Sequence, residues 1–210
     1  ITLHPFHTES GGGKQQTQCF NVPNGPSRVV LDNIKSCPDW VMGNAKGAGY
    51  YVARYDSVLR EQLRQRAPGL PAPEAIALLS DASLLTESGL QSVEDTLNMV
   101  AAHLSHQNPV VQQAALDWLK TIRLDWLNPA QQQVYTQLLR DKVVPLAKQL
   151  TWLDQATDSE AMRRLRETAL PLSADRGGDS ALRQQAAALA RAWLGKRDAI
   201  SAGMAKAVLM

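Results

Sequence analysis

The sequence of 210 residues has neither a long apolar run nor a clear excess of one charge. No stretch approaches the roughly 18 uninterrupted apolar residues that a transmembrane helix needs, so we expect no membrane span. Lys and Arg number 22 against 20 Asp and Glu, and a formal charge of +2 argues against a nucleic-acid-binding protein. What is present, 44% hydrophobic and 20% charged residues, is typical of a soluble globular chain.

The amino-terminal end shows no targeting signal, because it lacks a basic segment followed by an apolar one. The sequence begins at Ile1 without an initiator Met, which indicates a processed chain or an excised fragment. Only two cysteines are present, Cys19 and Cys37, on adjacent predicted strands. A disulfide bridge and two reduced thiols both fit this placement. The pair leaves the compartment open but favours an exported protein, periplasmic or secreted, over a cytoplasmic one.

Three catalytic motifs are missing. No His-Glu dipeptide occurs, which excludes the His-Glu-x-x-His zinc helix of metalloproteases, and no Gly-x-Ser-x-Gly nucleophile turn occurs either. Gly13 and Lys14 look like part of a phosphate-binding loop, but Thr8 stands where its first glycine is required, and Gln15 follows the lysine in place of Ser or Thr. We therefore predict no catalytic, cofactor-binding or metal-binding residue in this chain.

The four histidines form two His-x-x-His pairs, His4 with His7 and His103 with His106. Residues at i and i+3 can share one helix face, so a metal-dependent enzyme using His103 and His106 is one alternative. A zinc site requires at least three protein ligands, and neither pair has an evident third. Solvated histidines at a helix end are therefore the favoured interpretation.

Residues 1–55 have the pattern of β-structure, with turn signals at 11–13 and 23–26. We expect short strands at 18–22, 28–31, 40–42 and 50–55. In the last of these, alternation places Tyr51, Ala53 and Tyr55 on one face and the other three residues on the opposite face. So few strands cannot close a sandwich. The segment is predicted to be the remnant of an antiparallel β-sandwich domain whose other strands lie upstream.

From residue 56 the apolar residues recur at helical spacing, which predicts an α-helical domain over 56–210 that continues beyond Met210. Amphipathic helices are expected to start near 56, 72, 91, 109, 129, 159, 180 and 198. Asn108 and Asn128 each precede a proline suited to the first helical position, and Pro145 should end or kink the helix from 129. Short linkers between these starts predict helical hairpins stacked as a solenoid of the HEAT or armadillo type, although a helical bundle also fits.

The polar and aromatic residues of this region have structural interpretations. Three arginines lie among acidic residues between 158 and 167, the pattern of an exposed, ion-paired helix face (Arg163, Arg164 and Arg166). Four tryptophans are expected to pack between helices rather than to form a ligand cage (Trp118, Trp126, Trp152 and Trp193). In the helix from 129, Val134 and Leu138 are expected on the apolar stripe.

The junction near residue 56 carries a distinctive phrase: Trp40-Val41-Met42, Asn44, then Gly49-Tyr50-Tyr51-Val52-Ala53-Arg54-Tyr55-Asp56. It resembles the segment of M1-family zinc aminopeptidases that leaves the small β-sandwich domain and enters the C-terminal α-helical domain. Later pieces resemble the family in style (Leu79-Ser80-Asp81-Ala82, Gly89-Leu90, Leu165-Arg166 and Trp193-Leu194). The family's arginine follows the two tyrosines directly, whereas this chain has Val52 there and Arg54 two residues later, on the same face of an extended segment.

The resemblance implies that this chain is one part of a larger protein whose catalytic residues lie in another domain. The family's zinc helix and its Gly-x-Met-x-Asn peptide-clamping motif lie in an upstream catalytic domain, so zinc is expected in that missing domain and no catalytic residue carries over to this chain. The chain is then the non-catalytic C-terminal part of an aminopeptidase that caps the catalytic cleft and shapes the peptide-substrate chamber. Its implied partners are the catalytic domain of the same polypeptide and the peptide substrates, without nucleic acid or membrane. A free-standing HEAT-like protein-interaction scaffold is the alternative.

Overall fold

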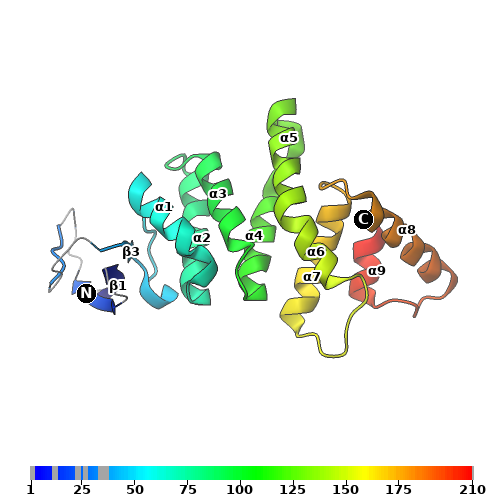
Figure 1. The fold of residues 1–210 in the computed structure, drawn as a ribbon, viewed down its shortest axis with the longest axis horizontal. Coiled ribbons are helices and arrows are strands. Elements are labelled where there is room, and N and C mark those ends of the chain that lie inside the picture. Colours follow the sequence, from blue (N-terminus) through cyan, green and yellow to red (C-terminus); the bar gives the residue numbers. More distant parts are fainter. Residues whose placement is uncertain (1–2, 11–13, 22–24, 26–27, 33–37, 210) are drawn as a thin grey trace. The chain divides into compact units, whose positions relative to one another are not determined.

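The computed structural model describes residues 3–10, 14–21, 25, 28–32 and 38–209 (Figure 1). For residues 3–10, 14–16 and 21 it describes the backbone. The chain forms two compact units, Ile1–His106 and Gln107–Met210. The chain changes from extended to helical structure near residue 56. Such a change does not by itself define a domain boundary, so the boundary predicted there stays a prediction.

An antiparallel sheet of three strands opens the first unit in the described residues. Its strands are β1 Leu3–Ser10, β2 Lys14–Asn21 and β3 Trp40–Met42, in the order β2-β1-β3. Ser10 pairs with Lys14, so β1 and β2 form a hairpin around residues 11–13, where the glycines predicted a turn. The strands predicted at 18–22 and 40–42 fall on β2 and β3. The β-sandwich stays a prediction.

The strand predicted at 28–31 is wrong. Val29 and Val30 are 37% and 76% exposed and have no strand pairing. β-branched residues favour a strand when one face of the pleat packs on a neighbour, and here neither valine has such cover. The chain is held instead by the Gln18 side chain, which donates to the Asp32 carbonyl at 2.6 Å and accepts the Asp32 N–H at 2.9 Å.

The strand predicted at 50–55 is wrong, because the segment after Gly49 is extended but forms no strand pairing in the described residues. Its predicted alternation is confirmed, because Tyr51, Ala53 and Tyr55 are half-buried while the residues between them are exposed. The Tyr51 hydroxyl donates to the Gly43 carbonyl, and the Gly43 N–H donates to the Tyr55 hydroxyl at 2.9 Å. Side-chain hydrogen bonds thus take the place of a backbone ladder.

Asn44 closes the loop that leads into this extended segment. Its side-chain amide donates to the Gly49 carbonyl at 3.0 Å, and its side-chain oxygen accepts the Gly49 N–H at 2.8 Å. One buried side chain therefore satisfies both backbone groups of Gly49. Val52 and Arg54 lie on the exposed face. The residues that carry the sequence resemblance are the ones that shape this loop.

Two buried carboxylates of α2 (Ala72–Glu87) accept hydrogen bonds from the stretch between β3 and the first helix. Asp81, which is 5% exposed, accepts the Ala53 N–H at 3.2 Å through Oδ2. Glu74, which is 1% exposed, accepts the Lys46 N–H at 2.8 Å through Oε1. The stretch between the sheet and the first helix is therefore fastened to α2 by buried polar groups.

Asp81→Asn should remove a pH dependence from the stability of the chain. Burial raises the pKa of the Asp81 carboxyl from 3.8 to about 6, against the hydrogen bond from Ala53, which lowers it. Because the folded-state pKa lies above the unfolded one, the free energy of unfolding falls as pH rises from about 4 to about 6, by at most about 3 kcal/mol. Asn keeps an oxygen for the Ala53 N–H and carries no charge.

Urea unfolding at about pH 4 and about pH 7.5 checks this prediction. The variant should be more stable than the native chain at the higher pH, and this advantage should shrink at the lower pH, where Asp81 is protonated in both states. An equal difference at the two pH values would contradict it.

The helices of the first unit begin close to the predicted positions. They are α1 Ser57–Arg66, α2 Ala72–Glu87 and α3 Val93–His103. Asp56 caps α1 by accepting the Leu59 N–H at 2.8 Å, and Ser92 caps α3 by accepting the Asp95 N–H at 3.1 Å. Their apolar faces bury a core of aliphatic and sulfur-containing side chains (Leu63, Leu78, Leu79, Met99 and Val100).

The second unit is helical throughout its regular elements. Its helices are α4 Pro109–Thr121, α5 Pro129–Leu138, α6 Val144–Leu150, α7 Glu160–Ala174, α8 Ser180–Gly195 and α9 Ala202–Leu209. Asn108 accepts the Val110 N–H at 2.9 Å. Asn128 accepts the Gln131 N–H at 2.9 Å, and the Gln131 side chain accepts the Asn128 N–H at 3.0 Å, which completes a capping box. Both predicted Asn-Pro helix starts are confirmed.

The helix that starts at Pro129 does not end at Pro145, and the alternative that this proline kinks it stays a prediction. α5 passes into a π-helical turn, Leu139–Val143, and α6 follows directly with Pro145 in its first turn. The wider turn rearranges the hydrogen bonds before the proline, and the first turn of a helix tolerates a residue without an N–H.

The buried face of α5 also differs from the predicted one. Val134, expected on the apolar stripe, is 64% exposed, whereas its neighbour Tyr135 is 2% exposed. The Tyr135 hydroxyl donates at 2.9 Å to the Leu119 carbonyl near the end of α4, which also accepts the Ile122 N–H at 3.3 Å. The aromatic ring with a polar tip, rather than the valine, takes the core position.

The described chain is mainly helical with little strand, as predicted. Stacking of the hairpins into a solenoid stays a prediction. In the part of the chain that the structure describes, no helix combines the length and the apolar character needed to cross a bilayer.

Candidate functional site: the cleft between α7, α8 and α9

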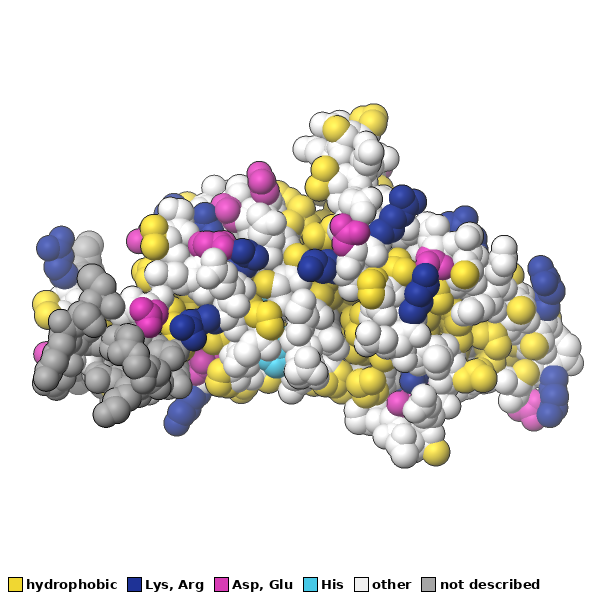
Figure 2. Space-filling model, in the orientation of Figure 1, with side chains coloured by type: hydrophobic (Ala, Val, Ile, Leu, Met, Phe, Trp, Pro, Cys, Tyr) yellow, Lys and Arg dark blue, Asp and Glu magenta, His cyan; other side chains and the backbone are white. Residues whose placement is uncertain are grey.

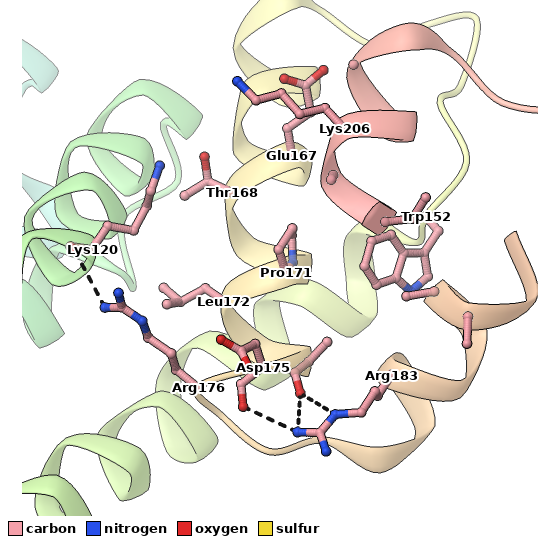
Figure 3. Close-up of a pocket in the computed structure, with 16 residues that line it drawn as sticks. Lys120, Trp152, Glu167, Thr168, Pro171, Leu172, Asp175, Arg176, Arg183 and Lys206 are labelled. Carbon is pink, nitrogen blue, oxygen red and sulfur yellow. Dashed lines mark hydrogen bonds between the residues drawn. The ribbon is translucent and has the colours of Figure 1, made fainter. Parts of the chain in front are cut away.

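A cleft of about 640 Å³ lies in the second unit, along one face of α7 (Figure 3). Its floor is formed by four α7 residues that share this face and by the residue just after the helix (Glu167, Thr168, Pro171 and Leu172, then Asp175). Pro171 sits inside the helix and has no N–H to donate to the Glu167 carbonyl one turn earlier. We call this feature the α7 cleft.

Small residues keep the α7 cleft open. α8 contributes Ala186 and Ala187 to its wall, and α9 contributes Gly203 and Ala207. A Cβ atom at Gly203 would lie 1.9 Å from Glu167 Oε1, so the missing side chain at this position lets the Glu167 carboxylate lie against α9. Larger side chains at these positions would fill the space.

Basic residues outnumber acidic ones around the α7 cleft. Lys120, Arg176, Arg183 and Lys206 line it, together with the carboxylates Glu167 and Asp175. The two arginines also have structural bonds. Arg176 Nη1 donates to the Ile122 carbonyl at 3.0 Å, and Arg183 Nη2 donates to the Ala174 carbonyl at 3.1 Å. Each thereby satisfies a carbonyl at a helix end and keeps its charge, so four basic side chains face two carboxylates and the local charge is positive.

The wall formed by Trp152 depends on a buried arginine. Arg166, 1% exposed, donates through Nε to the Leu150 and Thr151 carbonyls at 3.0 and 2.9 Å. Its Nη1 donates to Asp158 Oδ2 at 2.5 Å, which holds the pKa of that carboxyl below its usual range. Arg166 thus binds both ends of the segment 151–158, which places Trp152, 4% exposed, beside the cleft.

The predicted exposed face of α7 is therefore only partly correct. Arg164 and Glu160 form the expected surface pair at 2.6 Å, with both side chains more than two-thirds exposed. Arg166 is the exception, because it points into the unit and satisfies carbonyls at the end of α6 that have no helical donor. Spacing alone did not distinguish these two arginines, which lie on different sides of the helix.

The histidines predicted to be solvated are buried. His103 Nδ1 lies 2.7 Å from the Met99 carbonyl and Nε2 lies 2.9 Å from the Ala75 carbonyl, and burial lowers the pKa of this imidazole. His106 Nε2 lies 2.8 Å from the Leu70 carbonyl. These contacts fasten the end of α3 to the chain around the start of α2.

The described residues contain no group of three His, Cys, Asp or Glu that could hold a metal ion. A zinc ion therefore does not fit the side chains that the structure places here. His4 and His7 lie on β1, where the structure describes the backbone. Cys19 is exposed on β2, and Cys37 lies outside the described residues, so the disulfide and the exported compartment stay predictions.

The tryptophans divide into packed and exposed ones. Trp152 is buried, and Trp118 and Trp193 are half-buried, in agreement with packing between helices. For Trp126 the prediction is wrong, because this side chain is 74% exposed and has the Arg123 guanidinium 4.7 Å from the centre of its ring. It sits in a short 3-10 turn between α4 and α5.

Comparison with known proteins gives the wider context. Residues 40–210 match the model of the ERAP1-like C-terminal domain family. The chain is 23% identical to "Aminopeptidase 2, mitochondrial" of Saccharomyces cerevisiae over 133 residues, which are 62% of this chain and 14% of that relative. Both findings confirm the resemblance to the C-terminal region of M1-family aminopeptidases. The chain belongs to the ERAP1-like C-terminal domain family.

Proposed function

We propose that this chain is the non-catalytic C-terminal part of a zinc-dependent aminopeptidase, where it caps the catalytic cleft and shapes the chamber for peptide substrates. The observation that carries the proposal is the family match, which runs from β3 to the last residue. That match does not favour the free-standing interaction scaffold.

The chemistry of the described residues supports a covering role over a catalytic one. His103 and His106 have ring nitrogens at hydrogen-bond distance from backbone carbonyls, and no three candidate ligands meet in the described chain. Zinc is therefore assigned to a catalytic domain of the same polypeptide. A helical cap that closes over such a domain would exclude water and orient the peptide.

The test compares the parent aminopeptidase with a version that lacks these 210 residues. Both are assayed on a short aminoacyl anilide and on peptides of increasing length. Because a cap limits which substrates fit the chamber, its removal should abolish the preference between short and long peptides. Adding the chain back in trans should restore that preference if the shortened enzyme is folded.

The isolated chain should hydrolyse none of these substrates, with or without added zinc. Hydrolysis by the pure chain that a chelator abolishes would overturn the assignment of a non-catalytic part. An identical length preference in the two enzymes would overturn the cap.

A further inference from the structure

One buried carboxylate, between the extended segment and α2, has no opposite charge beside it. Asp81 is 5% exposed, and its Oδ2 accepts the Ala53 N–H at 3.2 Å. Among the residues that the structure describes, no basic side chain pairs with it. Figure 2 shows the usual arrangement on the surface over α1–α3, where acidic and basic side chains are both exposed to water. A carboxylate that is buried without a positive partner is costly in its ionised form.

The titratable groups that interact with Asp81 are acidic as well. Burial raises the pKa of the Tyr51 and Tyr55 hydroxyls on the extended segment, and the charge of Asp81 raises both further. Glu74, seven residues before Asp81 on the same helix, also raises the pKa of Tyr55. None of these groups supplies a positive charge. The folded chain therefore favours the neutral form of the Asp81 carboxyl, and burial raises its pKa to about 6.

The basic groups on the neighbouring elements have other surroundings. On α3, which packs on α2, His103 has backbone carbonyls at hydrogen-bond distance from both ring nitrogens. The Arg60 guanidinium of α1 pairs with the Asp95 carboxylate at 3.0 Å. The Lys46 side chain, which precedes the extended segment, is exposed. Asp81 therefore has to reach water to ionise at low cost.

The extended segment has one hydrogen bond to α2 in the described chain, the bond from Ala53 to Asp81. Its two half-buried tyrosines bond to Gly43 instead, and its backbone forms no strand pairing there. Earlier in the chain, Gly47, with a φ of 61°, packs closely on Pro73, where a Cβ atom would lie 2.7 Å from the carbonyl oxygen. The chain is thus fixed against the start of α2 at Gly47, and a single polar contact holds the segment beyond it.

We propose that the contact between Asp81 and Ala53 is a pH-sensitive latch, which holds the segment 50–55 on α2 while Asp81 is protonated and releases it more often when Asp81 is ionised. Local opening gives the ionised carboxylate access to water, so ionisation favours the open state while the helices stay folded. The pKa of Asp81 is about 6 in the closed state and returns toward 3.8 in the open one. The closed state is therefore most stable below about pH 4, and the open population rises on the order of 100-fold as pH passes through about 6.

Amide hydrogen exchange of the 210-residue chain measures this opening, because the Ala53 amide is bonded in the closed state and free in the open one. After correction for the intrinsic effect of pH on exchange, the protection of Ala53 should fall by about 30-fold between about pH 4.5 and about pH 7.5. Amides in the middle of α2 should remain better protected at both pH values. Constant protection of Ala53 would overturn the latch. Protection equal to that of the α2 amides would also overturn it, because the opening would then be global unfolding.

Two aspartates provide a matched pair of variants. Asp81→Asn keeps an oxygen for the Ala53 N–H but cannot ionise, so the protection of Ala53 should no longer depend on pH. Asp95→Asn makes the same change at a side chain that is 36% exposed and should leave the pH dependence as it is. Tyr55→Phe removes the acceptor of the Gly43 N–H and should raise the opening by a similar factor at both pH values. A pH dependence that survives in Asp81→Asn would overturn the role of this carboxyl.

The consequence for the parent enzyme rests on the proposed function. The latch lies where the chain passes from β3 to α1, so its opening should loosen the proposed cap. The preference of the parent between short and long peptides should then weaken from about pH 5.5 to about pH 7.5, and Asp81→Asn should keep it constant. The same pH dependence of this preference in both enzymes would overturn the link to the cap. Exchange at Ala53 decides the latch independently, and the enzyme that lacks the 210 residues decides the cap.

Discussion

Replacing Arg166 with alanine should lower the free energy of unfolding by about 3–5 kcal/mol. The guanidinium is buried and bonds two carbonyls at the end of α6 and the carboxylate of Asp158. Removing it leaves those acceptors without their donor and releases the segment that carries Trp152. Thr151, whose φ of 56° is unfavourable for a branched side chain, also loses a bond at its carbonyl.

Arg164→Ala is the matched control, because it removes the same side chain two positions earlier on α7. Its partner Glu160 is 73% exposed, and an exposed pair of this kind contributes at most about 0.5 kcal/mol. Urea unfolding of the two variants measures the difference. Equal loss of stability in both would show that Arg166 does not have the buried role that its contacts indicate.

Tyr135→Ala should also lower the free energy of unfolding by about 3–5 kcal/mol, as Arg166→Ala does. Val134→Ala should change it by less than about 0.5 kcal/mol. The tyrosine ring is 2% exposed and its hydroxyl donates to the Leu119 carbonyl, whereas the valine is 64% exposed. Thermal or urea unfolding of the two neighbours decides between the predicted stripe and the observed one. A larger loss for Val134→Ala would mean that α5 buries the predicted face and not the observed one.

The parts of the fold that the sequence predicted are those set by local chemistry. Asn108 and Asn128 begin helices because their side-chain oxygens accept a free N–H of the first turn. The extended segment keeps its alternation at Tyr51, Ala53 and Tyr55, which needs no knowledge of what covers it. Such features depend on neighbours along the chain, and the extended segment also carried the family resemblance.

The parts that failed depend on contacts between distant residues. Val29 and Val30 have the composition of a strand, but a strand forms only where a partner is available. Arg166 and Arg164 look equivalent in the sequence, yet one meets the end of α6 and the other faces water. His103 and His106 are buried because the Ala75 carbonyl of α2 and the Leu70 carbonyl just before α2 lie within hydrogen-bond distance of their Nε2 atoms.

No sequence motif predicts the α7 cleft. It exists because Ala and Gly occur on the facing sides of α8 and α9, and small residues in a helix are ordinary in sequence terms. The one available signal was the uneven charge, since residues 180–210 are far more basic than the chain as a whole.

The π-helical turn at Leu139–Val143 has a consequence for how this chain can vary in length. Such a turn accommodates one residue more than an α-helical turn, so the loss of a single residue there would restore ordinary geometry. Tyr135 before it and Ala147 after it could then keep their inward positions. Homologous chains are expected to differ by single-residue insertions or deletions at this point rather than inside α4 or α7, where a change of one residue would rotate every later side chain by about 100°.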